Sequence, residues 1–245
     1  IKKLLFFLTF TCVFCYNLIG DNMLSRLELL LGEKLEYLTS KVILIIGLGG
    51  VGSYALETLA RTGIKKIIIV DSDTIDESNL NRQLMTNINN IGLYKTDVWA
   101  DRIKSINPNC EVVKYTLFIT KENIALLFKE HVDYVIDACD TLNTKLEIIR
   151  YCLDNKIKFI SSMGMAKRIN NNYIKVSTLD KTKNDPLAKK LRMLVKKNGI
   201  KGNIPVVYSE ELPLKINGLG SIAHVTATAG VYITNYIIND ILRDV

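Results

Sequence analysis

Cysteine and histidine are scarce in this chain of 245 residues, with five of the first and two of the second. Cys12 and Cys15 form one C-x-x-C pair, but a zinc ribbon needs a second pair and none follows. The other cysteines lack the spacing of a disulfide framework, so we expect reduced thiols, no structural zinc and a cytoplasmic protein. Neither His131 nor His224 lies in a catalytic or metal-binding motif, and we expect both to be structural.

The sequence also lacks an apolar run that is long enough to span a bilayer. The stretch 4–15, which follows Lys2 and Lys3, is typical of the charged and apolar regions of a signal peptide but is too short to cross. No convincing cleavage site follows it, and Met23 begins a more typical protein. We therefore expect residues 1–22 to be an apolar extension and not a functional leader. Membrane or organelle association is expected only if that leader is real.

Acidic residues are nearly missing from one segment of the chain. Between Lys181 and Lys201, eight basic residues stand against a single acidic one, Asp185, an excess equal to the net charge of +7 of the whole chain. The pair Asp185 and Pro186 is typical of a helix start, and Gly199 of a helix end. A basic helix favours an acidic polymer as partner. Its candidate contacts are Lys189, Lys190, Arg192, Lys196 and Lys197.

Apolar runs alternate with helical patterns through most of the chain. The expected strands are 42–46, 66–70, 111–118, 132–137, 158–163, 173–179 and 206–211, and the expected helices are 24–38, 51–61, 94–106, 124–129, 141–155, 185–198 and 220–242. This predicts an α/β fold with a Rossmann-like, doubly wound, mostly parallel sheet, an antiparallel extension and a C-terminal helix. We expect a single domain over residues 23–245, with a nucleotide half near 40–160 and a substrate part near 161–230.

A glycine-rich turn follows the first expected strand and precedes a helical pattern. Glycines at such a turn let the backbone approach a phosphate, whose negative charge is favoured at a helix N-terminus. The next strand ends at Asp71, where a carboxylate can accept hydrogen bonds from a ribose. The glycine pattern alone would serve a dehydrogenase equally well. The predicted nucleotide-binding residues here are Gly47, Gly49, Gly50, Gly52 and Asp71.

The polar run after Asp71 distinguishes between classes of nucleotide enzyme. A nicotinamide enzyme has no particular need for two asparagines, an arginine and a glutamine within five residues, whereas attack on an α-phosphate does need them. Arg82 offers a planar fork to phosphate oxygens, and amide side chains can hold neighbouring oxygens without adding charge. The candidate residues of this run are Asp73, Asn79, Asn81, Arg82 and Gln83.

Two further residues complete the expected nucleotide site. Lys95, at the start of a later helix, can reach the phosphates, and Asp140, at the end of the fourth expected strand, can hold Mg²⁺. Because the carboxyl ends of parallel strands meet at one edge of a sheet, both residues are expected at the same crevice. The sequence therefore predicts ATP and Mg²⁺ as cofactors.

These motifs resemble those of the ubiquitin-activating-enzyme-like adenylyltransferases. The resemblance rests on the turn 47–52, the run 71–83, Lys95 and the stretch 136–140. It implies that a carboxylate is joined to AMP, with Arg82, Lys95 and Asp140 as catalytic residues. It also implies a homodimer in which Arg26 of each subunit reaches the site of the other, and it allows a sulfur-transfer system as a partner.

Within that family, three later segments are similar to the branch that dehydrates threonylcarbamoyladenosine in tRNA: 161–164, 184–192 and 218–230. The resemblance implies an ATP-dependent cyclisation through a carboxyl-adenylate, with tRNA held on the basic helix. One departure is the segment 165–168, which is bulkier than the glycine-containing loop expected there.

Three alternatives remain open. An activator of a ubiquitin-like sulfur-carrier protein would adenylate that protein's C-terminus, although no cysteine after Cys152 is available for a persulfide or thioester route. A nicotinamide oxidoreductase would release no pyrophosphate. A nucleotide-binding scaffold would keep its function when Arg82 or Asp140 is replaced by alanine.

Overall fold

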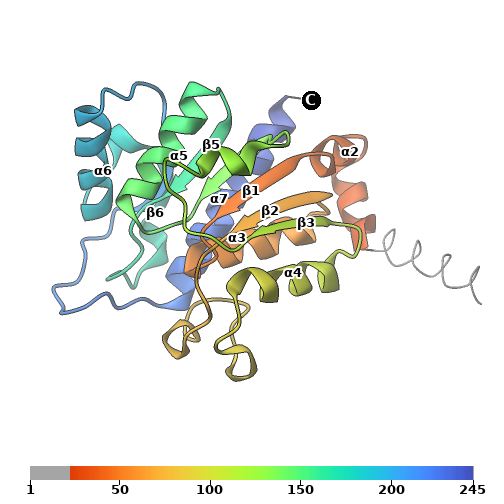
Figure 1. Ribbon diagram of the computed structural model, residues 1–245, viewed down its shortest axis with the longest axis horizontal. Helices are drawn as coiled ribbons and strands as arrows, with labels where there is room; N and C mark the ends of the chain where they lie inside the picture. The colour runs from red at the N-terminus through yellow and green to blue at the C-terminus, as the bar shows by residue number, and fades with distance from the viewer. Residues whose placement is uncertain (1–22, 245) are drawn as a thin grey trace, which may run out of the picture.

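The computed structural model describes residues 23–244, and the predictions for residues 1–22 lie outside that range. The described residues form a seven-stranded sheet with helices on both faces (Figure 1). Its strands are β1 (Val42–Ile46), β2 (Lys66–Val70), β3 (Glu111–Tyr115), β4 (Tyr134–Asp137), β5 (Lys158–Ser162), β6 (Ile174–Thr178) and β7 (Pro205–Ser209). The α-helices are residues 23–31, α2 (Lys34–Thr39), α3 (Gly50–Arg61), α4 (Lys95–Ile106), α5 (Leu142–Asp154), α6 (Pro186–Lys197) and α7 (Ala223–Arg243).

The strand order defines where the sheet can hold a ligand. It is β3-β2-β1-β4-β5-β7-β6, and every neighbouring pair is parallel except β6 and β7. The chain moves outward from β1 to β3 and then returns to β4 on the other side of β1. Ligands of such sheets bind at the carboxyl ends of the two strands where the order reverses, here β1 and β4. The predicted mostly parallel sheet with an antiparallel extension is confirmed.

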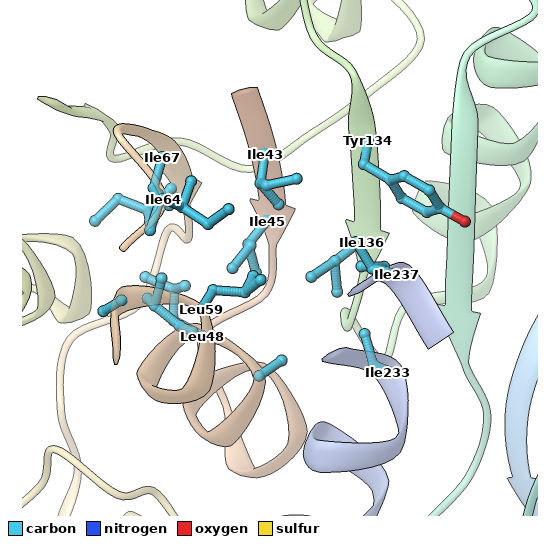
Figure 2. Packing of buried hydrophobic residues seen from close by; sticks show 14 of the residues in the cluster. Ile43, Ile45, Leu48, Leu59, Ile64, Ile67, Tyr134, Ile136, Ile233 and Ile237 are labelled. Carbon is cyan, nitrogen blue, oxygen red and sulfur yellow. The ribbon is translucent and has the colours of Figure 1, made fainter. Parts of the chain in front are cut away.

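The core lies on both faces of the sheet because successive side chains of a strand point to opposite faces. In β1, Ile43 and Ile45 belong to one buried cluster, while Leu44 and Ile46 belong to the other. Figure 2 shows the first cluster, in which Ile43, Ile45 and Ile136 face Leu59 of α3 and Ile233 and Ile237 of α7. The second cluster packs under α5 and α6. Burial on both faces explains why the central strands are unbroken apolar runs.

Helix α7 packs directly against α3, as its small residues allow. A Cβ atom built on Gly230 would lie 2.5 Å from the Val51 carbonyl oxygen and 2.8 Å from the Ala55 nitrogen, so the two backbones approach closely. The α3 helix begins at the glycine-rich turn. The C-terminal helix α7 therefore packs against the helix that begins at the glycine-rich turn, although the two segments are far apart in the sequence.

The structure corrects several expected boundaries. The helix expected over 24–38 is interrupted at Gly32, whose φ of 54° stops the helical hydrogen-bonding pattern. The third strand ends at Tyr115, and residues Ile124–Phe128 form a 3₁₀-helix, η3, where an α-helix was expected. The last helix begins at Ala223. Within residues 23–244, no helix is both long and apolar enough to cross a membrane.

Candidate functional site

The backbone of the glycine-rich turn packs closely against the turn that follows β4. Gly47 has a φ of +94°, and a Cβ on it would lie 2.7 Å from backbone atoms of Ala138 and Cys139. A Cβ on Gly52 would lie 1.9 Å from the Gly47 carbonyl oxygen. Any side chain at either position would push the two turns apart. These two glycines therefore set the shape of the crevice between β1 and β4.

Gly49 and Gly50 lie at the N-terminus of α3. Gly49 is the N-cap residue, and no side chain there satisfies the first backbone N–H groups of the helix. A Cβ on Gly49 would meet nothing closer than Nε2 of Gln83, at 3.9 Å. The turn therefore leaves open space beside unpaired N–H donors and the positive end of the helix dipole. This arrangement suits a phosphate group.

A cluster of charges borders the turn on the β2 side. Asp71 follows β2 and accepts hydrogen bonds from the backbone N–H groups of Leu48 (2.7 Å) and Asp73 (2.9 Å). Lys95 begins α4, is buried, and its Nζ lies 2.8 Å from Asp73 and 3.9 Å from Asp71. Burial raises the pKa of Asp71, and the Lys95 charge opposes that shift. Each oxygen of a carboxylate can accept a second hydrogen bond, so Asp71 remains able to bind a ribose hydroxyl.

The polar run after Asp71 forms a turn whose side chains have different environments. The Asn79 side chain closes a capping box with Asp76 around the 3₁₀-helix η1 (Glu77–Asn79), so it holds the turn itself. Arg82 donates from Nη1 to the Ser78 carbonyl (2.7 Å) and to Oδ1 of Asn81 (3.0 Å). Gln83 is buried near Gly49, and its Oε1 has no hydrogen-bond partner among the described residues.

Asn81 links this turn to a distant part of the chain. Its Nδ2 donates a hydrogen bond of 2.9 Å to the carbonyl oxygen of Ser221, in the irregular segment 210–222 that connects β7 to α7. The same segment bonds to the loop after β5, since the Lys167 backbone N–H donates to Gly220 (2.7 Å) and the Leu214 N–H donates to Lys167 (2.9 Å). The segment thus joins the nucleotide side of the crevice to the other side.

Asp140 lies exposed in the turn after β4, on the same edge as Gly47 and Asp71. Carboxylate oxygens are preferred ligands of Mg²⁺, which commonly uses one or two carboxylates together with phosphate oxygens. Among residues 23–244, no group of three or more His, Cys, Asp or Glu side chains could hold a metal alone. Asp140 therefore presents an exposed carboxylate of the kind that Mg²⁺ binds.

The sequence interpretation missed a buried polar network directly below Asp140. Asp137, Lys145 and Ser161 are each fully buried, and Lys145 Nζ lies 3.1 Å from both oxygens of Asp137 and 3.3 Å from Oγ of Ser161. Cys139 donates from its thiol to Asp137 (3.0 Å), and burial raises the pKa of that thiol well above its usual value. The available signal was that Lys145 falls on the apolar face of the expected helix 141–155, with Leu142, Leu146 and Ile149.

The basic helix α6 has the predicted boundaries and capping. Oδ1 of Asp185 accepts from the Ala188 N–H (2.9 Å), and Gly199 has a φ of +65° beyond the last turn. Lys189, Lys190, Lys196 and Lys197 are exposed. Arg192 differs, because its Nη1 donates to the carbonyl oxygens of Leu179 and Thr182, each at 3.1 Å. The structure therefore places the Arg192 side chain against its own chain, and four lysines face solvent.

Arg26 is not brought to the crevice by its own chain. It is exposed in the helix 23–31, whose Leu24 packs where a Cβ on Gly63 would lie, at the turn before β2. That turn is at the amino end of the strands, on the side of α2 (Figure 1). Any role of Arg26 in the nucleotide site therefore requires a second subunit.

The fold and the crevice define an adenylating class of protein, and the family model agrees. The chain matches the ThiF family over residues 22–236 and belongs to that family. Two of its similar relatives are tRNA threonylcarbamoyladenosine dehydratases. The Bacillus subtilis protein is 36% identical, with 91% of this chain and 96% of that protein covered. The Escherichia coli protein is 40% identical, with 82% of this chain and 78% of that protein covered.

A solved structure of a dehydratase of this kind is similar to this chain over nearly its whole length. The crystal structure of the E. coli tRNA N6-threonylcarbamoyladenosine dehydratase in complex with ATP superposes with a TM-score of 0.88 at 36% identity, covering 91% of this chain and 95% of that one. A probable molybdopterin-synthase adenylyltransferase of Porphyra purpurea is 40% identical, but over only 51% of this chain. Similarity to the dehydratases thus covers 82 to 91% of this chain, whereas similarity to that adenylyltransferase covers about half of it.

Proposed function

We propose that this protein dehydrates N6-threonylcarbamoyladenosine in tRNA, in a reaction that consumes ATP and passes through a carboxyl-adenylate. The observation that carries this proposal is an open glycine turn bordered by Asp71, Lys95 and Gln83, within a chain that matches the Bacillus subtilis dehydratase and the solved E. coli dehydratase structure over 91% of its length. The same turn in an oxidoreductase would need no such polar border. The proposal therefore makes ATP the nucleotide and the threonyl carboxylate its acceptor.

The residues of the crevice have separate roles in this reaction. ATP lies with its phosphates over Gly49 and Gly50 and its ribose on Asp71. The substrate carboxylate attacks the α-phosphorus, and the bond to pyrophosphate breaks. Lys95 and Arg82 neutralise charge that develops on the phosphate oxygens, a type of stabilisation worth about 3 kcal/mol per donor. The carbamoyl group then attacks the activated carbonyl, the ring closes and AMP leaves.

Lys95 is suited to this role because its present partners are weak competitors for a phosphate. Its nearer ion pair, at 2.8 Å, is with Asp73, a carboxylate whose side chain is 63% exposed, and the buried Asp71 lies farther away, at 3.9 Å. A phosphate carries more charge and arrives with its own cation, so it can take over the ammonium while Asp73 turns to the metal. Asp140 and Asp73 would hold Mg²⁺, which supplies charge neutralisation at the phosphates when it is bound.

Arg26 of a second subunit would complete the cationic lining of the site. The resemblance to the adenylyltransferases supports this role, and Arg26 lies at the amino end of the strands, where it is out of reach of its own chain's crevice. We propose a homodimer for this reason. Charge in a transition state is stabilised best by cations that are already in position, so the Arg26→Ala variant should lose turnover while retaining ATP binding.

The tRNA would lie along α6, with phosphates on Lys189, Lys190, Lys196 and Lys197. Lysine contacts with phosphates release counterions and weaken with salt, without specifying bases. Changing these four lysines to glutamate should abolish the salt-dependent part of tRNA binding. An affinity equal to that of the unchanged protein would exclude α6 as the tRNA surface.

The deciding experiment is mass spectrometry of modified tRNA after incubation with protein, ATP and Mg²⁺. We expect the modified nucleoside to lose the mass of one water, and the Asp140→Ala variant to leave it unchanged. An unchanged nucleoside mass with the unaltered protein would overturn the proposed function.

Adenylation of a sulfur-carrier protein is the second candidate, because a probable molybdopterin-synthase adenylyltransferase and an adenylyltransferase and sulfurtransferase match 51% and 54% of this chain. It predicts ATP–pyrophosphate exchange that depends on a carrier protein with a Gly-Gly C-terminus and is indifferent to tRNA. Exchange stimulated only by modified tRNA would exclude it.

A further inference from the structure

Arg168 is a buried cation that the proposed nucleotide chemistry does not use. Its residue is 2% exposed, and Nη2 donates a hydrogen bond of 2.9 Å to the carbonyl oxygen of Asn184. Nε and Nη1 are buried and have no hydrogen-bond partner among residues 23–244. A guanidinium carries one N–H on Nε and two on each terminal nitrogen. Three buried donors of a charged group are therefore unpaired.

The nearby acids do not pair with these donors: among residues 23–244, neither Asp185 nor Glu211 forms an ion pair with Arg168, and their oxygens accept from backbone N–H groups instead. Asp185 accepts from Ala188 (2.9 Å) and Gly164 (3.0 Å). Glu211 accepts from the backbone N–H groups of Ile169 and Asn170, at 3.0 to 3.3 Å. Burial lowers the pKa of Arg168, and the charges of Asp185 and Glu211 oppose that shift from beyond contact distance. A buried charge without a bonded partner is costly, and a ligand that accepts from its free donors would remove that cost.

The position of Arg168 places this unpaired charge on the substrate side of the crevice. It lies in the loop 163–170 that follows β5, and β5 is the immediate neighbour of β4, whose turn carries Asp140. Neighbouring strands lie about 4.8 Å apart, so the loop and the nucleotide turn share one edge of the sheet. Arg168 belongs to the segment 165–168, which is the departure from the expected glycine-containing loop.

The segments around Arg168 are irregular and are joined to one another by hydrogen bonds. Asn184 bonds through Nδ2 to the Glu210 carbonyl (2.8 Å), and Nζ of the neighbouring Lys167 bonds to the Ile216 carbonyl (2.7 Å). The connection 210–222 has no helix or strand of its own and exposes several large apolar side chains, Leu212, Leu214, Ile216, Leu219 and Ile222. Separation of this connection from the 165–168 loop would give a substrate access to the guanidinium.

We infer that Arg168 binds the carboxylate of the substrate's threonyl group through the N–H donors of Nε and Nη1 before that carboxylate is adenylated. This inference rests on the proposed function, which supplies the carboxylate. A carboxylate is small and planar and accepts several hydrogen bonds from a guanidinium, whereas a tRNA backbone phosphate is attached to a chain too large for a buried site. Arg168 is thus a residue that distinguishes modified from unmodified tRNA.

The test measures binding without ATP, so that no turnover occurs. Two forms of one tRNA are compared, one with threonylcarbamoyladenosine and one with the threonyl carboxylate converted to a primary amide. We expect the unchanged protein to prefer the carboxylate form and the Arg168→Met variant to lose about tenfold to a hundredfold of that preference, the range of a charge-assisted hydrogen bond. Affinity for the amide form should stay the same. Arg168→Lys should retain part of the preference.

Lys167→Met is the matched control, since Lys167 precedes Arg168 and its ammonium bonds to a main-chain carbonyl of the connection 210–222. It should keep the preference of the unchanged protein. Equal loss of affinity for both tRNA forms in Arg168→Met would show a phosphate contact, and an unchanged preference would show a structural role; either result overturns the inference. If Arg168→Met does not fold, Arg168→Lys and Arg168→Gln carry the same comparison.

Failure of the proposed function gives a different result. In that case the unchanged protein neither removes water from modified tRNA nor prefers the carboxylate form. If the unchanged protein removes water and Arg168→Met does so with an unchanged carboxylate preference, only the role of Arg168 is wrong.

Discussion

Lys145 and Arg168 are both buried cations at the carboxyl edge of one sheet, but their surroundings differ. Lys145 has a carboxylate, Asp137, within 3.1 Å on both oxygens, and Ser161 beside it. Arg168 has one carbonyl partner and two nitrogens without any. In the half of the edge near β1 and β4, the buried cation is paired with a carboxylate, and we call this the satisfied half. In the half near β5 and β7, the buried cation has no carboxylate partner among residues 23–244. We infer that the Asp137 and Lys145 network is a fixed support for the nucleotide turn, and that the Arg168 side is built to bind the substrate carboxylate.

Lys145→Met gives the largest effect expected from this comparison. It leaves the Asp137 carboxylate buried without its cation, and breaking a buried pair in this way costs about 3 to 5 kcal/mol. Urea unfolding should show a loss of that size. Arg168→Met breaks no ion pair and removes a buried charge, so its unfolding free energy should stay within about 1 kcal/mol or rise.

A double variant, Asp137→Asn with Lys145→Met, checks the cause of that loss. Removing both charges should restore at least about half of the lost stability, because replacing a whole buried pair is often near neutral. If the double variant is as unstable as Lys145→Met, the loss comes from packing, and the contrast between the two halves of the edge is not electrostatic.

The fold was predictable from the sequence where a local pattern of residues alone determines a strand or a helix. The first two strands have the expected bounds, since each is an apolar run that ends at a glycine or an aspartate. The buried networks were not predictable, because their members are brought together by the sheet. Asp137 and Ser161 are partners in the β4 and β5 register although they are far apart in the chain. Arg192 was assigned to tRNA by its charge, yet its side chain bonds to two carbonyls of its own chain.

Lys95→Met tests whether a charge in the satisfied half also acts on the nucleotide. The proposed role of its ammonium at the phosphates predicts a fall in kcat/KM for ATP of about 10²- to 10³-fold, with an unchanged preference for the carboxylate form of tRNA. Lys104→Met is the control, since Lys104 is exposed on the same helix and should keep normal kinetics. If Lys95→Met instead lost the preference for the carboxylate form of tRNA and kept normal ATP kinetics, Lys95 would act on the substrate and not on the nucleotide.

Gly49→Ala tests the nucleotide half of the edge by changing its shape, because the substitution adds a methyl group and alters no charge. Its Cβ would meet no protein atom closer than 3.9 Å, so the fold should tolerate it, but the methyl group would occupy the open space beside the α3 N-terminus. ATP affinity, measured by calorimetry, should fall at least about tenfold. Gly220→Ala, in the connection beside Lys167, should leave ATP affinity unchanged. Normal ATP binding by Gly49→Ala would place the phosphates elsewhere.

The cysteines test the same comparison without affecting stability or catalysis, through their protection from alkylation in the folded protein. Burial raises the pKa of Cys110 to about 11, that of Cys152 to about 12, and that of Cys139 well above its usual value. The reactive thiolate is therefore rare at pH 7.5, and iodoacetamide should modify these three residues at least about 100-fold more slowly than in the unfolded chain. Peptide mapping by mass spectrometry measures each thiol separately. Fast labelling of Cys139 in the folded protein would mean that the Asp137 and Lys145 network opens readily, and the satisfied half of the edge would then be no fixed support.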